Sequence, residues 1–280
     1  MQRDSLTIVP ASVRPAGPAR LLALASSGAW TSVALLRADA AGVECDSLAE
    51  PARPGQSTRL LAMIGEVLGG RDPGSLNAIA FDAGPGAFTG LRIGCSVAQG
   101  LGFARGLPLI PVGSLEAAAW RSLRLAGRPA ALALAANDAR MGEIYASVCL
   151  VRAPASGRDG PTVEALVEPS VCRPDAPPES MTPGAVVARH PELAGHDWFA
   201  AGDAWRGVGL GAAWQAVLTG GEPAGAAAGD AHAVAELALG LWRAGLAVPA
   251  EEASPRYVRD KVALDVDEQR SLRERRAEAR

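Results

Sequence analysis

Short apolar runs bounded by turn-forming residues alternate along this chain with longer segments in which apolar residues recur every three or four positions. Runs of the first kind predict β-strands, and segments of the second kind predict amphipathic helices. The strands are predicted at residues 20–25, 31–36, 43–48, 77–82, 108–112, 130–135, 143–151, 162–168 and 198–201. The helices are predicted at residues 57–68, 90–104, 114–126 and 232–246, with a further one starting near residue 205. Three strands, a helical region, a strand and a helix thus follow one another twice, which predicts an α/β protein.

The helix predicted at 90–104 has an unusual surface. Gly94, Ala98 and Gly102 recur at four-residue spacing, while Ile93 and Val97 belong to an apolar ridge. Glycine inside a helix costs about 1 kcal/mol relative to alanine. We therefore expect another backbone to approach this face closely, and the sequence leaves open whether it belongs to this chain or to a partner.

The helix predicted at 57–68 has a continuous apolar face. Ser57 is expected to be its N-cap, and Thr89 and Ser114 are expected to cap the two helices that follow. The apolar face consists of Leu60, Leu61, Ile64, Val67 and Leu68.

A glycine-rich turn, Gly84-Pro85-Gly86, precedes the helix at 90–104. Such a turn directs backbone amides toward the amino end of the helix. A dinucleotide-binding loop would need glycine where Thr89 stands, and a P-loop would need Gly-Lys-Ser/Thr where residues 90–92 read Gly-Leu-Arg. The sequence therefore excludes both nucleotide-binding motifs.

Charge and cysteine content narrow the possible functions. The chain has 27 basic and 30 acidic residues and a net charge of -3, so no overall basic field favours nucleic acid. None of its four cysteines belongs to a Cys-x-x-Cys motif, and its three histidines are not spaced as in zinc enzymes. The sequence therefore predicts no metal site.

The two ends of the chain differ from the rest. Residues 1–19 contain no apolar run long enough for a signal or membrane segment and are expected to be a flexible extension. Residues 266–280 alternate acids and arginines, which is typical of a solvated helix or disorder, with a tRNA-contacting arm as the less favoured alternative. We expect a cytoplasmic protein without a membrane partner.

Three stretches resemble one protein family. GPGAFTGLRIG at 84–94, the small-residue helix after it and SLEA at 114–117 are similar to the signature of the TsaB (YeaZ) family. DARMGEIY at 138–145 is similar to DARRGEVY in that family, and PRYVRDKVA at 255–263 is similar to its Pro-x-Tyr-Leu-Arg-x-x-Val-Ala ending. The likeness spans about residues 20–263.

The resemblance implies an actin-like (ASKHA) fold built from a duplicated βββαβα unit, with a first lobe at 20–126 and a second at 127–265. It implies an accessory, non-catalytic subunit that binds the catalytic subunit TsaD, and through the complex TsaE, in making N6-threonylcarbamoyladenosine beside the anticodon of tRNA. This chain would bind no cofactor alone and would contact tRNA indirectly, and partner subunits would handle ATP and Mg²⁺.

The same resemblance implies that the helices at 57–68 and 90–104 form the surface for TsaD, or for a homodimer in its absence. That both helices only cover a sheet is the structural alternative. The expected interface residues are Leu60, Leu61, Ile64, Leu91, Arg92, Ile93, Val97, Gln99 and Gly100.

Departures from the family pattern bear on activity. Ala25-Ser26-Ser27 stands where relatives read Asp-Thr-Ser, so the first turn lacks the acidic residue that positions the metal in actin-like ATPases. We interpret these serines as capping a hairpin. An independent actin-type ATPase is the weaker hypothesis, and a peptidase lacks both metal ligands and a nucleophile paired with a base.

The turn that resembles DARRGEVY has Met141 in place of its second arginine. Its polar residues are expected to form a local ion-pair lattice, and a secondary contact with a partner or tRNA is the alternative. These residues are Asp138, Arg140, Glu143 and Tyr145.

Overall fold

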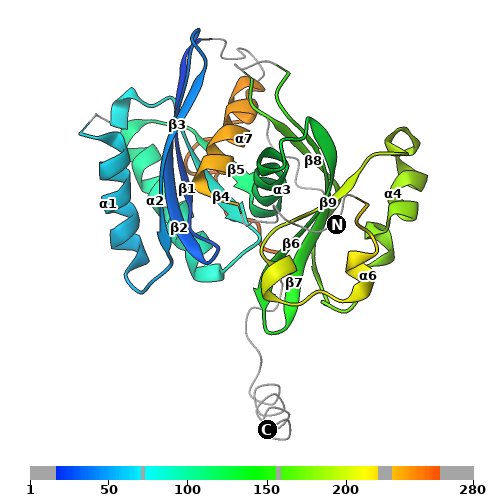
Figure 1. Ribbon diagram of the computed structural model, residues 1–280. Coiled ribbons are helices and arrows are strands. Elements are labelled where there is room, and N and C mark those ends of the chain that lie inside the picture. The colour runs from blue at the N-terminus through cyan, green and yellow to red at the C-terminus, as the bar shows by residue number, and fades with distance from the viewer. Residues whose placement is uncertain (1–16, 71–72, 156–158, 220–228, 259–280) are drawn as a thin grey trace, which may run out of the picture.

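The computed structural model describes residues 17–70, 73–155, 159–219 and 229–258, which form two β-sheets with helices on both faces of each (Figure 1). In the first sheet the strand order is β3-β2-β1-β4-β5, and in the second it is β8-β7-β6-β9. The first three strands of each sheet are antiparallel, and the next strand along the chain pairs in parallel with the first. The strands are β1 (Ala19–Ala25), β2 (Trp30–Ala38), β3 (Val43–Pro51), β4 (Ala78–Gly84), β5 (Leu109–Gly113), β6 (Ala130–Arg140), β7 (Glu143–Arg152), β8 (Thr162–Cys172) and β9 (Trp198–Ala201).

The helices form three layers around the two sheets. As Figure 1 shows, α1 and α2 cover the outer face of the first sheet, α3 and α7 lie between the sheets, and α4 and α6 lie beyond the second sheet. The α-helices are α1 (Gln56–Leu68), α2 (Phe88–Arg105), α3 (Ser114–Leu125), α4 (Pro183–Arg189), α5 (Ala204–Gly207), α6 (Ala212–Gln215) and α7 (Ala231–Arg243). Short 3-10 turns occur at Pro73–Ser75, Glu179–Met181 and Pro191–Leu193. No helix of the described residues is both long and apolar enough to span a membrane.

Helices α3 and α7 are exchanged between the two halves of the sequence. Helix α3 precedes residue 127 but packs on β6, β7, β8 and β9 of the second sheet, and α7 follows it but packs on β1, β2, β4 and β5 of the first sheet. The packing therefore crosses the predicted boundary between 20–126 and 127–265. Both helices lie in the layer between the sheets, where they contact one another. In that layer α3 lies against the second sheet and α7 lies against the first.

The middle layer is built mostly from small side chains. The β1 residues that face it are Ala19, Leu21, Ala23 and Ala25, and the β6 residues that face it are Ala131, Ala133 and Ala135. Larger residues alternate with them toward the outer helices, such as Leu22 and Leu24 of β1 and Leu132 and Leu134 of β6. Because alanine leaves room for close approach, two helices fit between the sheets.

The predicted N-caps were wrong at three helices. Helices α1, α2 and α3 begin after Gly55, Ala87 and Gly113, and none of these three cap positions makes a side-chain capping hydrogen bond. The side chain of Ser114 lies one position inside α3 and instead donates to Asp82. The hydroxyl therefore serves a tertiary contact, which a capping rule based on local sequence does not include.

The last described segment, residues 248–258, runs back from α7 to the first lobe, and we call it the strap. Val248 forms a β-bridge with Leu109, and the Arg256 N–H donates to the carbonyl of Ala83 at 2.7 Å. The predictions for residues 1–16 and for residues beyond 258, including most of PRYVRDKVA and the tail at 266–280, fall outside the described residues.

Candidate functional site

The glycine-rich loop is pressed against the turn between β1 and β2. The Ala87 N–H donates to the Ser27 carbonyl at 2.8 Å, and the Ser26 hydroxyl donates to the Gly90 carbonyl at 2.8 Å. A Cβ at Gly90 would clash with the backbone of Ser26. The close approach predicted for the glycines of α2 is thus made by this chain itself at Gly90, and also at Gly102, which abuts the Leu107 carbonyl.

A buried carboxylate lies beneath this loop. Asp82 at the end of β4 accepts hydrogen bonds from the hydroxyls of Ser27 and Ser114 and from the Gly84 N–H at 3.1 Å. Burial raises the pKa of Asp82, and the two hydroxyls and the Gly84 amide act in the opposite direction. These hydrogen bonds join the β1–β2 turn, β4 and α3.

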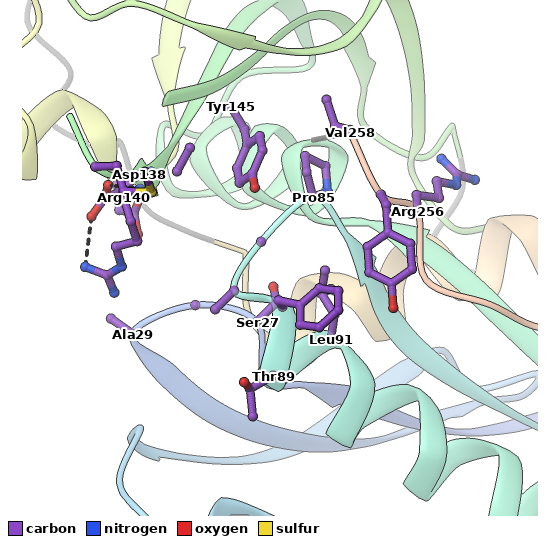
Figure 2. Close-up of a pocket in the computed structure, with 18 residues that line it drawn as sticks. Ser27, Ala29, Pro85, Thr89, Leu91, Asp138, Arg140, Tyr145, Arg256 and Val258 are labelled. Atoms are coloured by element: carbon purple, nitrogen blue, oxygen red, sulfur yellow. Dashed lines mark hydrogen bonds and ion pairs between the residues drawn. The ribbon is translucent and has the colours of Figure 1, made fainter. Parts of the chain in front are cut away.

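A cavity of about 300 Å³ opens between the glycine-rich loop and the turn between β6 and β7 (Figure 2). In Figure 2, Tyr145 points into it beside Pro85, and Arg140 and Arg256 lie at opposite sides. Its other walls come from the β1–β2 turn, the start of α2 and the strap. Of the four predicted residues of the loop, Pro85, Gly86 and Thr89 line this cavity and Gly84 does not, and the Gly84–Pro85 peptide is cis.

The β6–β7 turn forms one wall of the cavity. The Arg140 guanidinium pairs with the Asp138 carboxylate at 2.9 Å, and the Asp138 N–H donates to Asp203 at 2.9 Å. Arg140 and Met141 adopt left-handed backbone conformations with φ of 64° and 59°. The predicted ion-pair lattice is present in its Asp138–Arg140 part, and burial raises the pKa of the neighbouring Asp203.

A second hollow lies deeper, between the β1–β2 and β6–β7 turns. It has a volume of about 30 Å³, and Asp82, Asp138 and Asp203 are among its lining residues. This volume corresponds to about one water molecule. Among the described residues no group of three His, Cys, Asp or Glu side chains is arranged to hold a metal ion.

The outer face of α1 and α2 is a candidate contact surface. A groove of about 380 Å³ runs between them, lined by Ser57, Phe88, Thr89, Arg92, Ile93, Ser96 and Val97. Leu61 of α1 is 52% exposed and Phe103 of α2 is 79% exposed. An exposed apolar face of this kind on two adjacent helices is typical of a protein interface.

Eight of the nine expected interface residues divide into two sets, and the ninth, Gln99, is half-buried. Leu61, Arg92 and Gly100 are exposed, and Ile93 and Val97 are partly exposed along the groove. Leu60, Ile64 and Leu91 are instead buried, because they belong to the half of each helix that packs on the first sheet or the loop. These three residues cannot contact a partner in this structure, and the helical pattern alone did not separate the two faces.

The comparisons with known proteins agree with this fold. The chain is 34% identical over 208 residues to the tRNA threonylcarbamoyladenosine biosynthesis protein TsaB of Escherichia coli, covering 73% of this chain and 81% of that protein. The chain belongs to the TsaB family. The protein of the same name from Haemophilus influenzae is 42% identical over 129 residues, an alignment that covers 45% of this chain and only about half, 52%, of that relative.

A solved structure and a family model extend the match. YeaZ from Pseudomonas aeruginosa is 31% identical and superposes with a TM-score of 0.65 over 85% of this chain and 99% of that chain. The family model described as "TsaD: tRNA N6-adenosine threonylcarbamoyltransferase" matches residues 51–172. The TsaB-family fold of this chain is therefore a mixed α/β fold with two sheets, related to the actin-like class.

Several residues of this TsaB-family site were not singled out from the sequence. Glu116 of α3 lies in a largely buried position 3.5 Å from the Arg256 guanidinium, and its Oε2 has no hydrogen-bond partner. Tyr257 packs beside Phe88, with 5.4 Å between the ring centroids. The SLEA and PRYV stretches contained the only signal for them, because their contacts join parts of the chain about 140 and 170 residues apart.

Proposed function

We propose that this chain is an accessory, non-catalytic subunit in the biosynthesis of N6-threonylcarbamoyladenosine in tRNA, and that it binds a TsaD-type transferase through α1 and α2. TsaE would join through the complex, and ATP, Mg²⁺ and tRNA would be handled by those partners. Membership of the TsaB family supports a role in threonylcarbamoyladenosine biosynthesis, since the matched relatives are named tRNA threonylcarbamoyladenosine biosynthesis protein TsaB. We also infer that the two halves, with their matching strand order, derive from one duplicated βββαβα unit.

The observation that carries the proposal is the outer face of α1 and α2. Leu61 and Phe103 are exposed on these helices, and Ile93 and Val97 line the groove. Ser96 and Gly100 are small exposed residues of α2. A Cβ at Gly100 would meet no atom within 4 Å, so its lack of a side chain serves no packing inside this chain. Glycine at an open helical position lowers helix stability by about 1 kcal/mol relative to alanine. Its presence at position 100 is consistent with close approach by another protein.

The geometry argues against an independent actin-type ATPase. The deeper hollow between the two hairpin turns holds only about 30 Å³, while both turns also line the outer cavity of about 300 Å³. The β1–β2 turn, which lacks a carboxylate of its own, is also held against the start of α2.

The docking proposal is tested by substitution at Gly100. Gly100→Trp should abolish co-purification with a TsaD-type transferase, because the indole occupies the face on which the partner packs. Gly184→Trp is the matched control, since Gly184 is also an exposed helical glycine with no atom within 4 Å of a Cβ, but lies on α4 of the other lobe.

Circular dichroism should show that both variants are folded. Pairing that survives Gly100→Trp would contradict the assignment of this face. Size-exclusion chromatography of the isolated chain would show whether the same face forms a homodimer, in which case Gly100→Trp should also dissociate it.

A further inference from the structure

The strap lies along one side of α2 and is fixed to it by side-chain hydrogen bonds. The Gln99 amide donates to the carbonyls of Ala250 at 3.2 Å and Ala253 at 2.9 Å. The Cys95 thiol lies 3.9 Å from the Ala253 carbonyl. Gln99, which was expected to contact a partner, thus holds the chain's own strap in place instead.

The strap ends in a stack that immobilises Arg92 on the exposed side of α2. The Arg92 guanidinium carbon lies 3.8 Å from the centroid of the Phe88 ring, and its Nε donates to the Tyr257 hydroxyl at 3.3 Å. The Tyr257 ring in turn packs against Phe88 at an interplanar angle of 40°. An arginine held by a cation–π contact and a hydrogen bond presents its remaining donors in a fixed direction.

Arg92 has no carboxylate partner within the part of the chain that the structure describes. Its contacts are the Phe88 ring and the Tyr257 hydroxyl, both neutral. Arg92 is also the only charged side chain among the described residues that line the groove between α1 and α2. Arg59 on α1 differs from Arg92 in this respect, because it forms ion pairs with Glu50 and Glu66.

These observations specify what the groove can accept. Its partner should bring apolar side chains to Ile93 and Val97 and a carboxylate to Arg92. A second copy of this chain fits poorly, because a two-fold interface brings the same patch to itself and this groove offers Arg92 no carboxylate. The charge pattern therefore favours a different protein as the occupant.

We propose that Arg92, held by Phe88 and by Tyr257 of the strap, is the charged anchor of the docking surface, and that the transferase subunit presents a carboxylate among aliphatic residues to it. This inference rests on the proposed function and adds the strap to the interface. Tyr257 is 49% exposed beside Arg92, so the partner would contact the strap as well as the helices.

The test is the affinity of a purified TsaD-type transferase for the full chain, measured by titration calorimetry. Arg92→Glu should weaken binding at least about thirtyfold, because it places two like charges together in the interface. Tyr257→Phe removes only the hydroxyl that holds Arg92 and should weaken binding about three- to tenfold. Arg173→Glu, the same charge change at an exposed arginine of the second lobe, should leave the affinity unchanged.

The outcomes separate this inference from the proposed function. If the unaltered chain does not bind the transferase, the proposed function fails. If the unaltered chain binds and Arg92→Glu binds equally well, or if Arg92→Glu affects only self-association, the anchor assignment alone is overturned. Restored binding of Arg92→Glu by one Asp→Arg or Glu→Arg substitution in the transferase would identify the paired carboxylate and support the inference.

Discussion

Buried acidic residues are concentrated where the two lobes meet. Asp82, Glu116 and Asp203 each belong to this region, and burial raises the pKa of each. Asp82 has compensating donors from Ser27 and Ser114, whereas Glu116 has a backbone hydrogen bond, Arg256 at 3.5 Å and one unpartnered oxygen. Glu116 therefore keeps one oxygen without a hydrogen-bond partner in a largely buried position.

Glu116→Gln should flatten the dependence of stability on pH. A raised pKa means that the folded chain holds the Glu116 proton more tightly than the unfolded chain, whose pKa is near 4.5. The free energy of unfolding then falls as pH rises from about 4.5 through the higher folded pKa. Glutamine does not ionise, so it removes this fall in the free energy of unfolding, and its side-chain oxygen can still accept a hydrogen bond from Arg256. Between pH 5 and pH 8 the variant should therefore become more stable relative to the unaltered chain, as measured by urea denaturation.

Glu252→Gln is the control for that measurement, since it removes an exposed carboxyl on the strap. Its difference in unfolding free energy from the unaltered chain should stay nearly constant over the same pH range. A Glu116→Gln curve parallel to that of the unaltered chain would show that Glu116 ionises without cost in the folded state. The contribution of Asp82 is present in all three proteins and largely cancels in the differences.

At the scale of elements, α2 has one face adapted to its own chain and another that is open. Gly90 packs on the backbone of Ser26, while a Cβ at Gly100 would meet open space. Gly90→Ala should therefore destabilise the fold by about 1–3 kcal/mol through overpacking. Gly100→Ala should stabilise it by about 0.5–1 kcal/mol through helix propensity. Chemical denaturation of both variants checks the pair, and equal effects would contradict the assignment of the two faces.

The elements were largely predictable from sequence, and their partners were not. Within the described residues, the nine strands and the four long helices were predicted with their type correct, because period-two and period-3.6 patterns are local. The caps at Ser57, Thr89 and Ser114 were wrong, since Gly55, Ala87 and Gly113 occupy those positions. The role of Ser114 depends on Asp82, 32 residues away, and no local rule contains that contact.

The candidate site shows the same division between local and distant information. The glycine-rich loop and the Asp138–Arg140 pair were found because their residues are adjacent in sequence. The Phe88–Arg92–Tyr257 stack was not found, because it brings the strap against α2 across 165 residues. Which half of each helix is exposed also depends on the sheet beneath it, so Leu60 and Ile64 were indistinguishable from Leu61 in the sequence.

At the scale of the whole molecule, the exchange of α3 and α7 makes the two lobes mutually dependent. Apolar residues of the first sheet, such as Leu21, Leu36 and Ile110, lie in one core with Val234 and Leu237 of α7. A fragment of residues 17–126 lacks α7, so this face of its sheet would be open to water. The energetic consequence is large, since burial of each such side chain contributes about 1.5–3 kcal/mol.

We therefore expect residues 17–126 expressed alone to aggregate or to melt without cooperativity, and to become soluble when co-expressed with residues 127–258. Co-expression with residues 127–219, which end before α7, should not restore solubility and isolates the contribution of that helix. Differential scanning calorimetry of the soluble pair should show a single transition, because the shared core couples the lobes. A fragment 17–126 that melts cooperatively by itself would mean that the first lobe is an independent folding unit and that α7 only reinforces it.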